Sequence, residues 1–172
     1  MNELKILDAT CGTKRIWYQK SHPFVTFIDK RKETLKESRI GRKETFRIEP
    51  NIIADWTKKL PFDNEHFDMV IFDPPHIFGN PEKKLMNMQK YYGWLDKKTY
   101  RNDIQKGFKE LFRVLKSEGI FILKWCETCV KLDEILKLSP YRPMFGTRTG
   151  QANKNHWVLF IKHKLEKELN IN

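Results

Sequence analysis

The stretch Phe67-Asp68-Met69-Val70-Ile71-Phe72-Asp73-Pro74-Pro75-His76 decides how the rest of this chain is interpreted. Residues 67–72 run from a polar loop into an apolar, β-branched centre, which predicts a buried strand. Pro74 and Pro75 have no N–H to donate to a neighbouring strand, so the backbone must leave the sheet after Asp73. We therefore expect a stiff turn at the carboxyl end of a strand, the edge at which open α/β sheets bind ligands.

Upstream of this stretch, three further apolar segments end at or beside an acid. Strands are predicted over residues 4–9, 24–29 and 51–55, which carry the acids Asp8, Asp29 and Asp55. The first strand leads into the small-residue turn Thr10-Cys11-Gly12-Thr13, and residues 14–19 are predicted to form a short helix. A strand, a tight turn and a helix in this order bring backbone N–H groups close to a ligand.

Downstream, the clearest helix is predicted over residues 102–116. Its apolar side chains recur at helical spacing and form one stripe, which is core rather than a functional site: Ile104, Phe108, Leu111, Phe112 and Leu115. The chain then predicts a strand over 119–125, a helix over 132–138, and two strands over 141–149 and 156–163 joined by a turn at 150–155. The polar tail, residues 164–172, is expected to fray.

Two segments between these elements are long and basic. Residues 30–50 are interpreted as an exposed, mobile basic arm, with a short helix at most over 34–39. The arm is either a solvated surface or a contact for phosphates. Residues 77–101 interleave six Lys/Arg with aromatic side chains, a pattern that suits a single strand or an extruded base, although a lid over the core is the alternative.

Composition limits the class of protein. The 172 residues have a net charge of +11 and 40% hydrophobic residues, which fits one folded domain over residues 1–172. The charge favours a polyanionic partner such as nucleic acid, and a basic protein without such a partner is the alternative. Three cysteines do not make a disulfide framework, and the pair Cys126 and Cys129 lacks a second pair to complete a zinc site. We expect no metal. The N-terminus lacks a signal-peptide core and no apolar run is long enough to span a membrane, so we expect a cytoplasmic protein.

The motif Asp73-Pro74-Pro75-His76 resembles the Asp-Pro-Pro-aromatic motif of S-adenosylmethionine-dependent amino-methyltransferases, above all those that act on adenine N6. Residues 8–14 resemble the first motif of class I methyltransferases, D-x-G-x-G-x-G, with Asp8 and Gly12 matching and Thr10 and Lys14 in place of the outer glycines. Ala54-Asp55 followed by Leu60-Pro61-Phe62 resembles the third motif of that family.

The resemblance covers residues 4 to about 163, and the closest likeness is to small phage or prophage adenine-type enzymes. It implies an α/β, Rossmann-like class I methyltransferase domain with a mostly parallel central sheet, an antiparallel C-terminal hairpin and helices on both faces. It also implies S-adenosylmethionine as the cofactor, with S-adenosylhomocysteine as the product. The residues implied to bind the cofactor are Asp8, Ala9, Thr10, Gly12, Asp29, Asp55, Trp56 and Asp73. Among them, Asp29 takes the position of the acid that accepts the ribose hydroxyls, for which a carboxylate offers two acceptor oxygens.

The implied catalytic residues are Asp73, Pro74 and His76. An exocyclic amine is a poor nucleophile, and the Asp73 carboxylate with the Pro74 carbonyl would accept its hydrogens and steady the positive charge that grows on nitrogen. His76 departs from the family pattern, because imidazole is a smaller stacking platform than the usual Tyr, Phe or Trp and titrates near neutral pH. A target in a duplex would have to leave the stack. The residues expected to bind substrate are Pro75, Tyr91, Tyr92 and Trp94.

Three functions remain open from the sequence. The first is methylation of an exocyclic amino group on a nucleic-acid base, with adenine N6 in DNA favoured. The second is methylation of RNA or of a small molecule on the same scaffold. The third is an inactive methyltransferase-like module that binds nucleic acid or supports a partner. Two observations favour it: the first motif lacks its outer glycines, and His76 replaces the usual aromatic residue.

Overall fold

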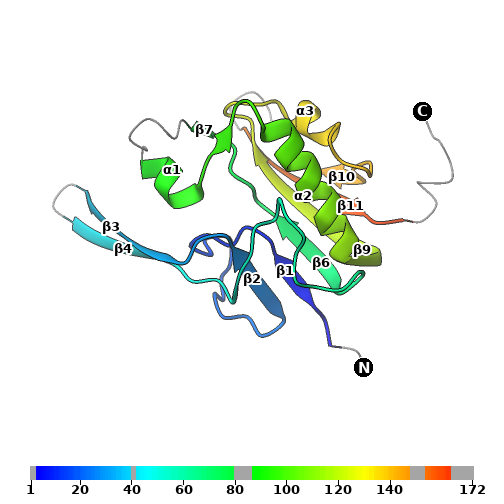
Figure 1. Ribbon diagram of the computed structural model, residues 1–172, viewed down its shortest axis with the longest axis horizontal. Helices are drawn as coiled ribbons and strands as arrows, with labels where there is room; N and C mark the ends of the chain where they lie inside the picture. The colour runs from blue at the N-terminus through cyan, green and yellow to red at the C-terminus, as the bar shows by residue number, and fades with distance from the viewer. Residues whose placement is uncertain (1–2, 40–41, 80–86, 148–153, 164–172) are drawn as a thin grey trace.

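The computed structural model describes residues 3–39, 42–79, 87–147 and 154–163 (Figure 1). A seven-stranded sheet has the order β10-β11-β9-β6-β1-β2-β5. Its strands are β1 (Ile6–Asp8), β2 (Val25–Asp29), β5 (Ile52–Ile53), β6 (Phe67–Phe72), β9 (Leu115–Cys126), β10 (Phe145–Gly146) and β11 (Asn155–Ile161). β1, β2, β5, β6 and β9 run parallel, and β11 runs antiparallel to its neighbours β9 and β10. The predicted mostly parallel sheet with an antiparallel C-terminal pair is confirmed.

The sheet grows outward from β1 in both directions. Leu7 pairs with Thr26 of β2 on one side and with Val70 of β6 on the other. In open α/β sheets the ligand crevice lies at the carboxyl ends of the strands, at the point where the strand order reverses. The ends of β1, β2 and β6 meet at this point, and they carry Asp8, Asp29 and Asp73.

One face of the sheet is covered by the helices α2 (Tyr100–Val114) and α3 (Leu132–Leu136). The aromatic side chains of the core stack between α2 and the strands, and the Phe112 and Phe121 ring centroids lie 4.5 Å apart. Gly107 lets α2 approach closely, because a Cβ at this position would come within 2.6 Å of the Trp56 ring. No helix in the described residues is long and apolar enough to span a membrane.

The opposite face carries a second, smaller apolar cluster, and in the described part of the chain no helix belongs to it. Residues 14–19, predicted as a helix, instead form a series of turns, so that prediction is wrong and the expected helices on both faces are found on one. Tertiary contacts hold this segment: the Trp17 indole donates to Asp8 Oδ2 at 2.7 Å and its ring meets Phe27 edge-on at 5.4 Å. The Trp17 side chain, which reaches back to Asp8 at the end of β1, thus holds this segment in place of helical hydrogen bonds.

The segment between β2 and β5 contains a hairpin in place of the short helix. β3 (Glu33–Arg39) pairs antiparallel with β4 (Arg42–Ile48), and Figure 1 shows the two strands extending away from the central sheet. The predicted helix over 34–39 is therefore wrong. Its residues lack a helical apolar period, and the cross-strand pair of Leu35 and Phe46 supplies a strand contact instead.

The segment 77–101 contains short elements rather than one open loop. β7 (Phe78–Gly79) pairs parallel with β8 (Leu95–Asp96), and α1 (Asn87–Tyr92) lies between them in the chain. The Gln89 amide donates to the Phe78 carbonyl at 3.0 Å, which ties α1 to β7. Residues 80–86 of the predicted substrate loop, the tip of the predicted turn at 150–155 and the tail 164–172 lie outside the described residues.

Candidate functional site

A cavity of about 260 Å³ opens at the carboxyl edge of the sheet, where β1, β2 and β6 end. The structure brings most of the predicted site residues to its walls: Asp8, Ala9, Thr10, Gly12, Asp29, Trp56, Asp73, Pro75, His76, Tyr91 and Tyr92. They come from separate parts of the chain, and the parallel sheet gathers them because each strand ends at the same edge. The cavity is slightly smaller than the ~300–1,000 Å³ of typical ligand pockets.

Asp8 lies at the buried floor of the cavity, with 1% of its surface exposed. Its Oδ1 accepts from the Thr10 backbone N–H at 3.1 Å, and its Oδ2 accepts from the Trp17 indole. Burial is the main cause that raises the pKa of Asp8 to about 6, and Asp73 and Asp29 add to the rise while the two hydrogen bonds oppose it. A cationic ligand bound beside Asp8 would favour the charged form of this carboxyl group and lower its pKa.

Gly12 and Asp29 join the first turn to the end of β2. Gly12 adopts a φ of +47°, a left-handed conformation that favours glycine, and its N–H donates to Asp29 Oδ2 at 3.1 Å. The Arg31 backbone N–H donates to the other oxygen, Oδ1, at 2.9 Å, and the Arg31 Nε lies 3.3 Å from the same atom. Both carboxylate oxygens therefore already accept hydrogen bonds from the chain.

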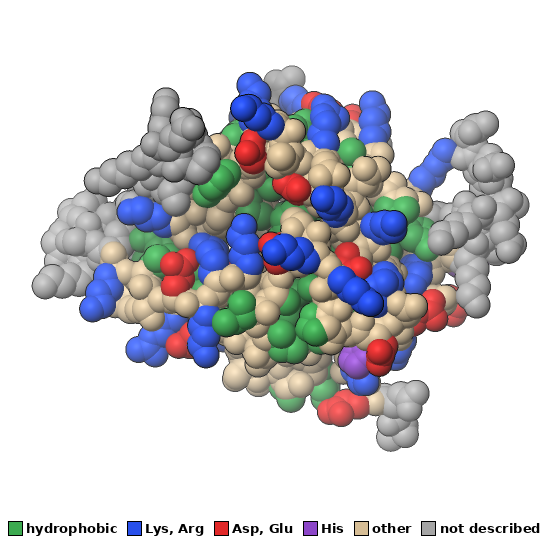
Figure 2. Space-filling model, viewed as in Figure 1, with side chains coloured by type: hydrophobic (Ala, Val, Ile, Leu, Met, Phe, Trp, Pro, Cys, Tyr) green, Lys and Arg blue, Asp and Glu red, His purple; other side chains and the backbone are tan. Residues whose placement is uncertain are grey.

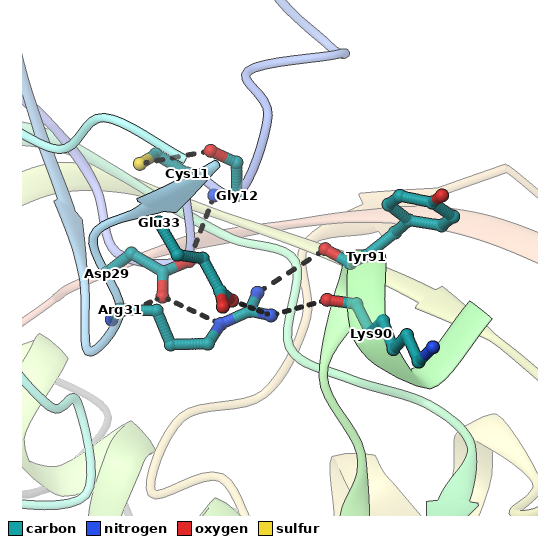
Figure 3. Close-up of polar contacts among 7 residues, drawn as sticks. All are labelled: Cys11, Gly12, Asp29, Arg31, Glu33, Lys90 and Tyr91. Atoms are coloured by element: carbon teal, nitrogen blue, oxygen red, sulfur yellow. Dashed lines mark hydrogen bonds and ion pairs between the residues drawn. The ribbon is translucent and has the colours of Figure 1, made fainter. Parts of the chain in front are cut away.

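Arg31 extends from Asp29 to the C-terminal end of α1 (Figure 3). Its guanidinium donates to the carbonyl oxygens of Lys90 at 2.7 Å and Tyr91 at 3.3 Å, and it pairs with Glu33 at 3.2 Å. A cation beside the last carbonyls of a helix is electrostatically favourable. The sequence analysis did not identify Arg31, because nothing in its local pattern indicated that α1 would pack against the end of β2.

Asp73 has a cationic partner, Lys124, that the sequence analysis did not include among the site residues. The Lys124 ammonium, on the neighbouring strand β9, donates to Asp73 Oδ2 at 2.7 Å, and both side chains are about one-fifth exposed. The Asp73 backbone N–H donates to the Thr10 hydroxyl at 2.9 Å, which ties the two turns together. The register that pairs Phe72 with Leu123 places Lys124 beside Asp73, and that register is a tertiary property.

His76 forms part of the cavity wall beside Trp125, whose ring it meets edge-on at 6.4 Å. Burial is the main cause that lowers the pKa of His76, and the Asp73 charge and the Pro74 carbonyl oppose it. The imidazole is therefore mostly neutral at pH 7. Its Nδ1 is buried and has no hydrogen-bond partner among the described residues.

Three predicted site residues do not line the cavity. Asp55 Oδ1 accepts from the backbone N–H and the hydroxyl of Thr57, at 3.0 and 2.8 Å, and so caps its own turn. Trp94 lines a neighbouring groove of about 480 Å³, together with Trp56 and Arg31. Pro74 is buried and is not among the residues that line the cavity.

The cavity chemistry fits S-adenosylmethionine. Its acids, Asp8, Asp29 and Asp73, suit a ligand that carries an ammonium, a sulfonium and a ribose diol, and the Gly12 turn leaves space for a close approach. Asp8 and Asp29 would hold the amino and ribose groups. Among the described residues, no group of three or more His, Cys, Asp or Glu side chains is placed to bind a metal ion.

Solved structures share this fold. The PH0226 protein from Pyrococcus horikoshii OT3 superposes with a TM-score of 0.59 at 17% identity, over 95% of this chain and 83% of that chain. A SAM-dependent methyltransferase from Methanosarcina mazei gives a TM-score of 0.53 at 13% identity, over 95% and 94%. The 1,6-didemethyltoxoflavin-N1-methyltransferase of Burkholderia thailandensis, solved with S-adenosylhomocysteine, gives 0.51 at 12% identity, over 92% and 71%.

Comparison with curated protein sequences finds no match. By contrast, residues 1–159 match the family described as "Methyltransferase domain", which is most of the 172-residue chain. That match agrees with the strand order, and with the acids and the glycine turn gathered at the carboxyl edge of the sheet. The chain therefore belongs to the methyltransferase domain family, and its cofactor is S-adenosylmethionine.

Proposed function

We propose that this methyltransferase methylates an exocyclic amino group of a nucleic-acid base, with adenine N6 in DNA as the first candidate. The observation that carries the proposal is the position of Asp73. This acid follows β6 directly, begins the Asp73-Pro74-Pro75-His76 turn and lines the same cavity as Asp8, Gly12 and Asp29.

The ion pair with Lys124 divides the two oxygens of Asp73 between different tasks. Oδ2 accepts from the Lys124 ammonium, so Oδ1 is the oxygen left for a substrate amine. The Pro74 carbonyl is the second acceptor in the proposal. Two acceptors on the amine hydrogens draw the nitrogen toward a tetrahedral shape and stabilise the positive charge that develops on it. The bound cofactor supplies a methyl group activated by its sulfonium.

His76 takes the position of the ring that stacks on the target base. Because burial lowers its pKa, the imidazole is mostly neutral at pH 7 and presents an uncharged face to the base. Tyr92 and Tyr91 line the cavity from the side of α1. A base entering from a duplex would have to leave the stack, so a single-stranded or distorted target is the easier substrate.

The test is mass spectrometry of nucleosides. Single-stranded DNA, duplex DNA and RNA are each incubated with the protein and S-adenosylmethionine labelled on the methyl group, then digested. The proposal expects labelled N6-methyladenine, most of it from single-stranded DNA. Label on the exocyclic amine of another base would change the proposed target base, and the proposed reaction, methylation of an amino group, would stand. If no base carries label, the proposal is wrong.

Two further arms of the test address the other functions left open by the sequence. A panel of small heterocyclic amines tests a small-molecule substrate, whose methylation would not weaken with added salt as binding to a polyanion does. Calorimetry with S-adenosylmethionine and S-adenosylhomocysteine tests an inactive module, because such a module would give no binding heat with either ligand.

A further inference from the structure

A basic groove of about 610 Å³ lies beside the cofactor cavity, between the turn after β1 and the strand β4. Four cationic side chains line it and one acid, Glu49, opposes them: Lys14, Arg15, Lys20 and Arg47. Lys and Arg side chains are spread over the face of the molecule in Figure 2, with acids between them. The groove differs from that general surface because its cations outnumber its acids four to one.

Two of these cations are available to a ligand. Lys20 and Arg47 are exposed, and the ion pairs found among the described residues include neither of them. Lys14 lies over the Phe27 ring at 4.1 Å, which fixes its position without neutralising its charge. A groove lined by several cations without acidic partners among the described residues suits a chain of phosphates better than a single small anion.

Arg15 connects this groove to the methyl-transfer cavity, because its side chain lines both. Its Nη1 donates to the Tyr92 hydroxyl at 2.6 Å, and its guanidinium carbon lies 5.5 Å from the centroid of the Phe46 ring. The Phe46 ring in turn meets Tyr91 edge-on at 4.8 Å. The wall between groove and cavity is therefore a row of aromatic and guanidinium groups. Side chains of these kinds are the ones on which unpaired bases stack in proteins that bind single strands.

We propose that this groove binds the sugar-phosphate backbone of a single-stranded polynucleotide, whose target base passes the Arg15 and Tyr92 side chains to reach Asp73. Arg47 of the hairpin β3–β4 lines one side of the groove, and Lys20 of the turns after β1 lines the other. This inference rests on the proposed function for its target base. The binding of the backbone can be measured without any methyl transfer.

A second basic groove, of about 480 Å³, carries a similar excess of cations away from the cofactor cavity. It lies along α2, and its cations include Lys58, Lys59, Lys106 and Lys109. None of the residues that line it also lines the cofactor cavity, so a strand bound there would not lead to Asp73. It therefore provides a control of similar charge at a different place.

The experiment measures fluorescence anisotropy of a short labelled single-stranded DNA with the full chain. The double variant Lys20→Glu with Arg47→Glu is compared with Lys106→Glu with Lys109→Glu, which changes the net charge by the same amount. We expect the first variant to bind at least about tenfold more weakly, and its slope of log affinity against log salt to fall by about 0.7 for each phosphate that the groove no longer neutralises. The affinity of the second variant should stay within about threefold of that of the unmodified chain. Charges that do not contact the strand act on it from a distance, where salt screens them.

Thermal melting of both variants, with Lys20→Gln and Arg47→Gln as milder substitutions, separates a defect in binding from a defect in folding. An equal or larger decrease in affinity in the α2 variant, or unchanged binding in both, overturns the proposal. Parallel DNA and RNA arms show which polynucleotide the groove prefers. Wild-type binding that depends on the groove, without any methylated base, would overturn the proposed function but leave this groove as a polynucleotide site.

Discussion

Asp73 is the residue on which the proposed chemistry depends. Asp73→Asn keeps the size of the side chain but removes the negative charge that would stabilise the methylated amine. We expect methyl transfer to fall by about 10²–10³ or more, the loss seen when one preorganised electrostatic group is removed. Calorimetry should show S-adenosylhomocysteine binding within about threefold of the unmodified chain, since the neutral sulfur needs no acid beside it. The matched control is Asp63→Asn, at an exposed position outside the cavity. Full activity in Asp73→Asn would exclude Asp73 as the acceptor.

Lys124 is expected to act as a positioning residue for Asp73. Lys124→Met removes the ammonium that holds Oδ2, so the carboxylate loses its fixed orientation. We expect kcat to fall by about 10–100-fold, with partial recovery in Lys124→Arg. S-Adenosylmethionine should bind as tightly or more tightly, because the variant cavity has one cation fewer. If cofactor affinity and kcat fall together, Lys124 supports the cofactor site rather than the substrate amine.

Asp8 predicts a pH dependence of cofactor binding. Its pKa of about 6 means that the carboxylate is charged above pH 6 and gains a proton as the pH falls through that value. A cationic ligand favours the charged form, so the dissociation constant of S-adenosylmethionine should rise by up to about tenfold per pH unit below the pKa. Calorimetry from about pH 7.5 to 5 measures this, since that range spans the pKa. Asp8→Asn should bind more weakly and lose most of the slope, and a flat profile in the unmodified chain would contradict the assignment.

At the scale of elements, α1 depends on two arginines that come from distant parts of the chain. Arg31 caps its last carbonyls and Arg15 donates to the Tyr92 hydroxyl. The helix is only six residues long, and a helix of this length is not stable without such contacts. The position of Tyr91 and Tyr92 at the cavity therefore follows from side chains outside α1.

Arg31→Ala should loosen α1 without unfolding the domain. Removing two hydrogen bonds from a charged donor costs about 1–3 kcal/mol locally, which corresponds to roughly 5–150-fold faster amide exchange in α1. Hydrogen exchange followed by mass spectrometry of the peptide that covers residues 87–92 measures the change. Arg101→Ala is the control, since Arg101 pairs with Glu134 on α3 instead. Equal exchange in both variants would show that Arg31 does not hold the helix.

For the whole molecule, stability is concentrated in the face of the sheet that α2 covers. Phe121 is fully buried, and its ring meets Phe112, Phe108 and Phe160. Within the described residues, the opposite face carries the smaller cluster around Phe27, covered by turns. The molecule therefore has one thick apolar layer, and the site lies at its edge, where rigid strand ends meet loops.

Phe121→Ala should lower the free energy of unfolding by about 3–5 kcal/mol, the usual cost of emptying a buried aromatic position. Phe145→Ala makes the same chemical change on β10 at a position that is 64% exposed, and it should change stability by less than about 0.5 kcal/mol. Urea denaturation followed by circular dichroism compares the two variants. A similar loss in both would show that the aromatic cluster beneath α2 is not the main source of stability.

The local sequence pattern was enough to predict the elements that bury their own apolar side chains. β6 begins at Phe67 and ends at Phe72, as predicted. A short apolar run that two prolines bring to an end has few conformations open to it other than a buried strand. The stripe of α2 lies in the core for the same reason, since a face at helical spacing must be buried against something. The acids expected to bind one cofactor at the carboxyl ends of the parallel strands are Asp8, Asp29, Asp55 and Asp73. Three of them line one cavity, whereas Asp55 caps its own turn.

Segments whose local pattern is polar or mixed take their form from long-range contacts, which the sequence pattern does not reveal. The segments 14–19 and 33–48 carry no strong period, so long-range contacts set their form: Trp17 reaches Asp8, and β3 pairs with β4. The partners Lys124 and Arg31 depend on strand register and on the docking of α1, which are set by contacts between residues far apart in the chain. A local pattern fixes periodicity and burial, but a pairwise contact between distant residues exists only once the chain has folded.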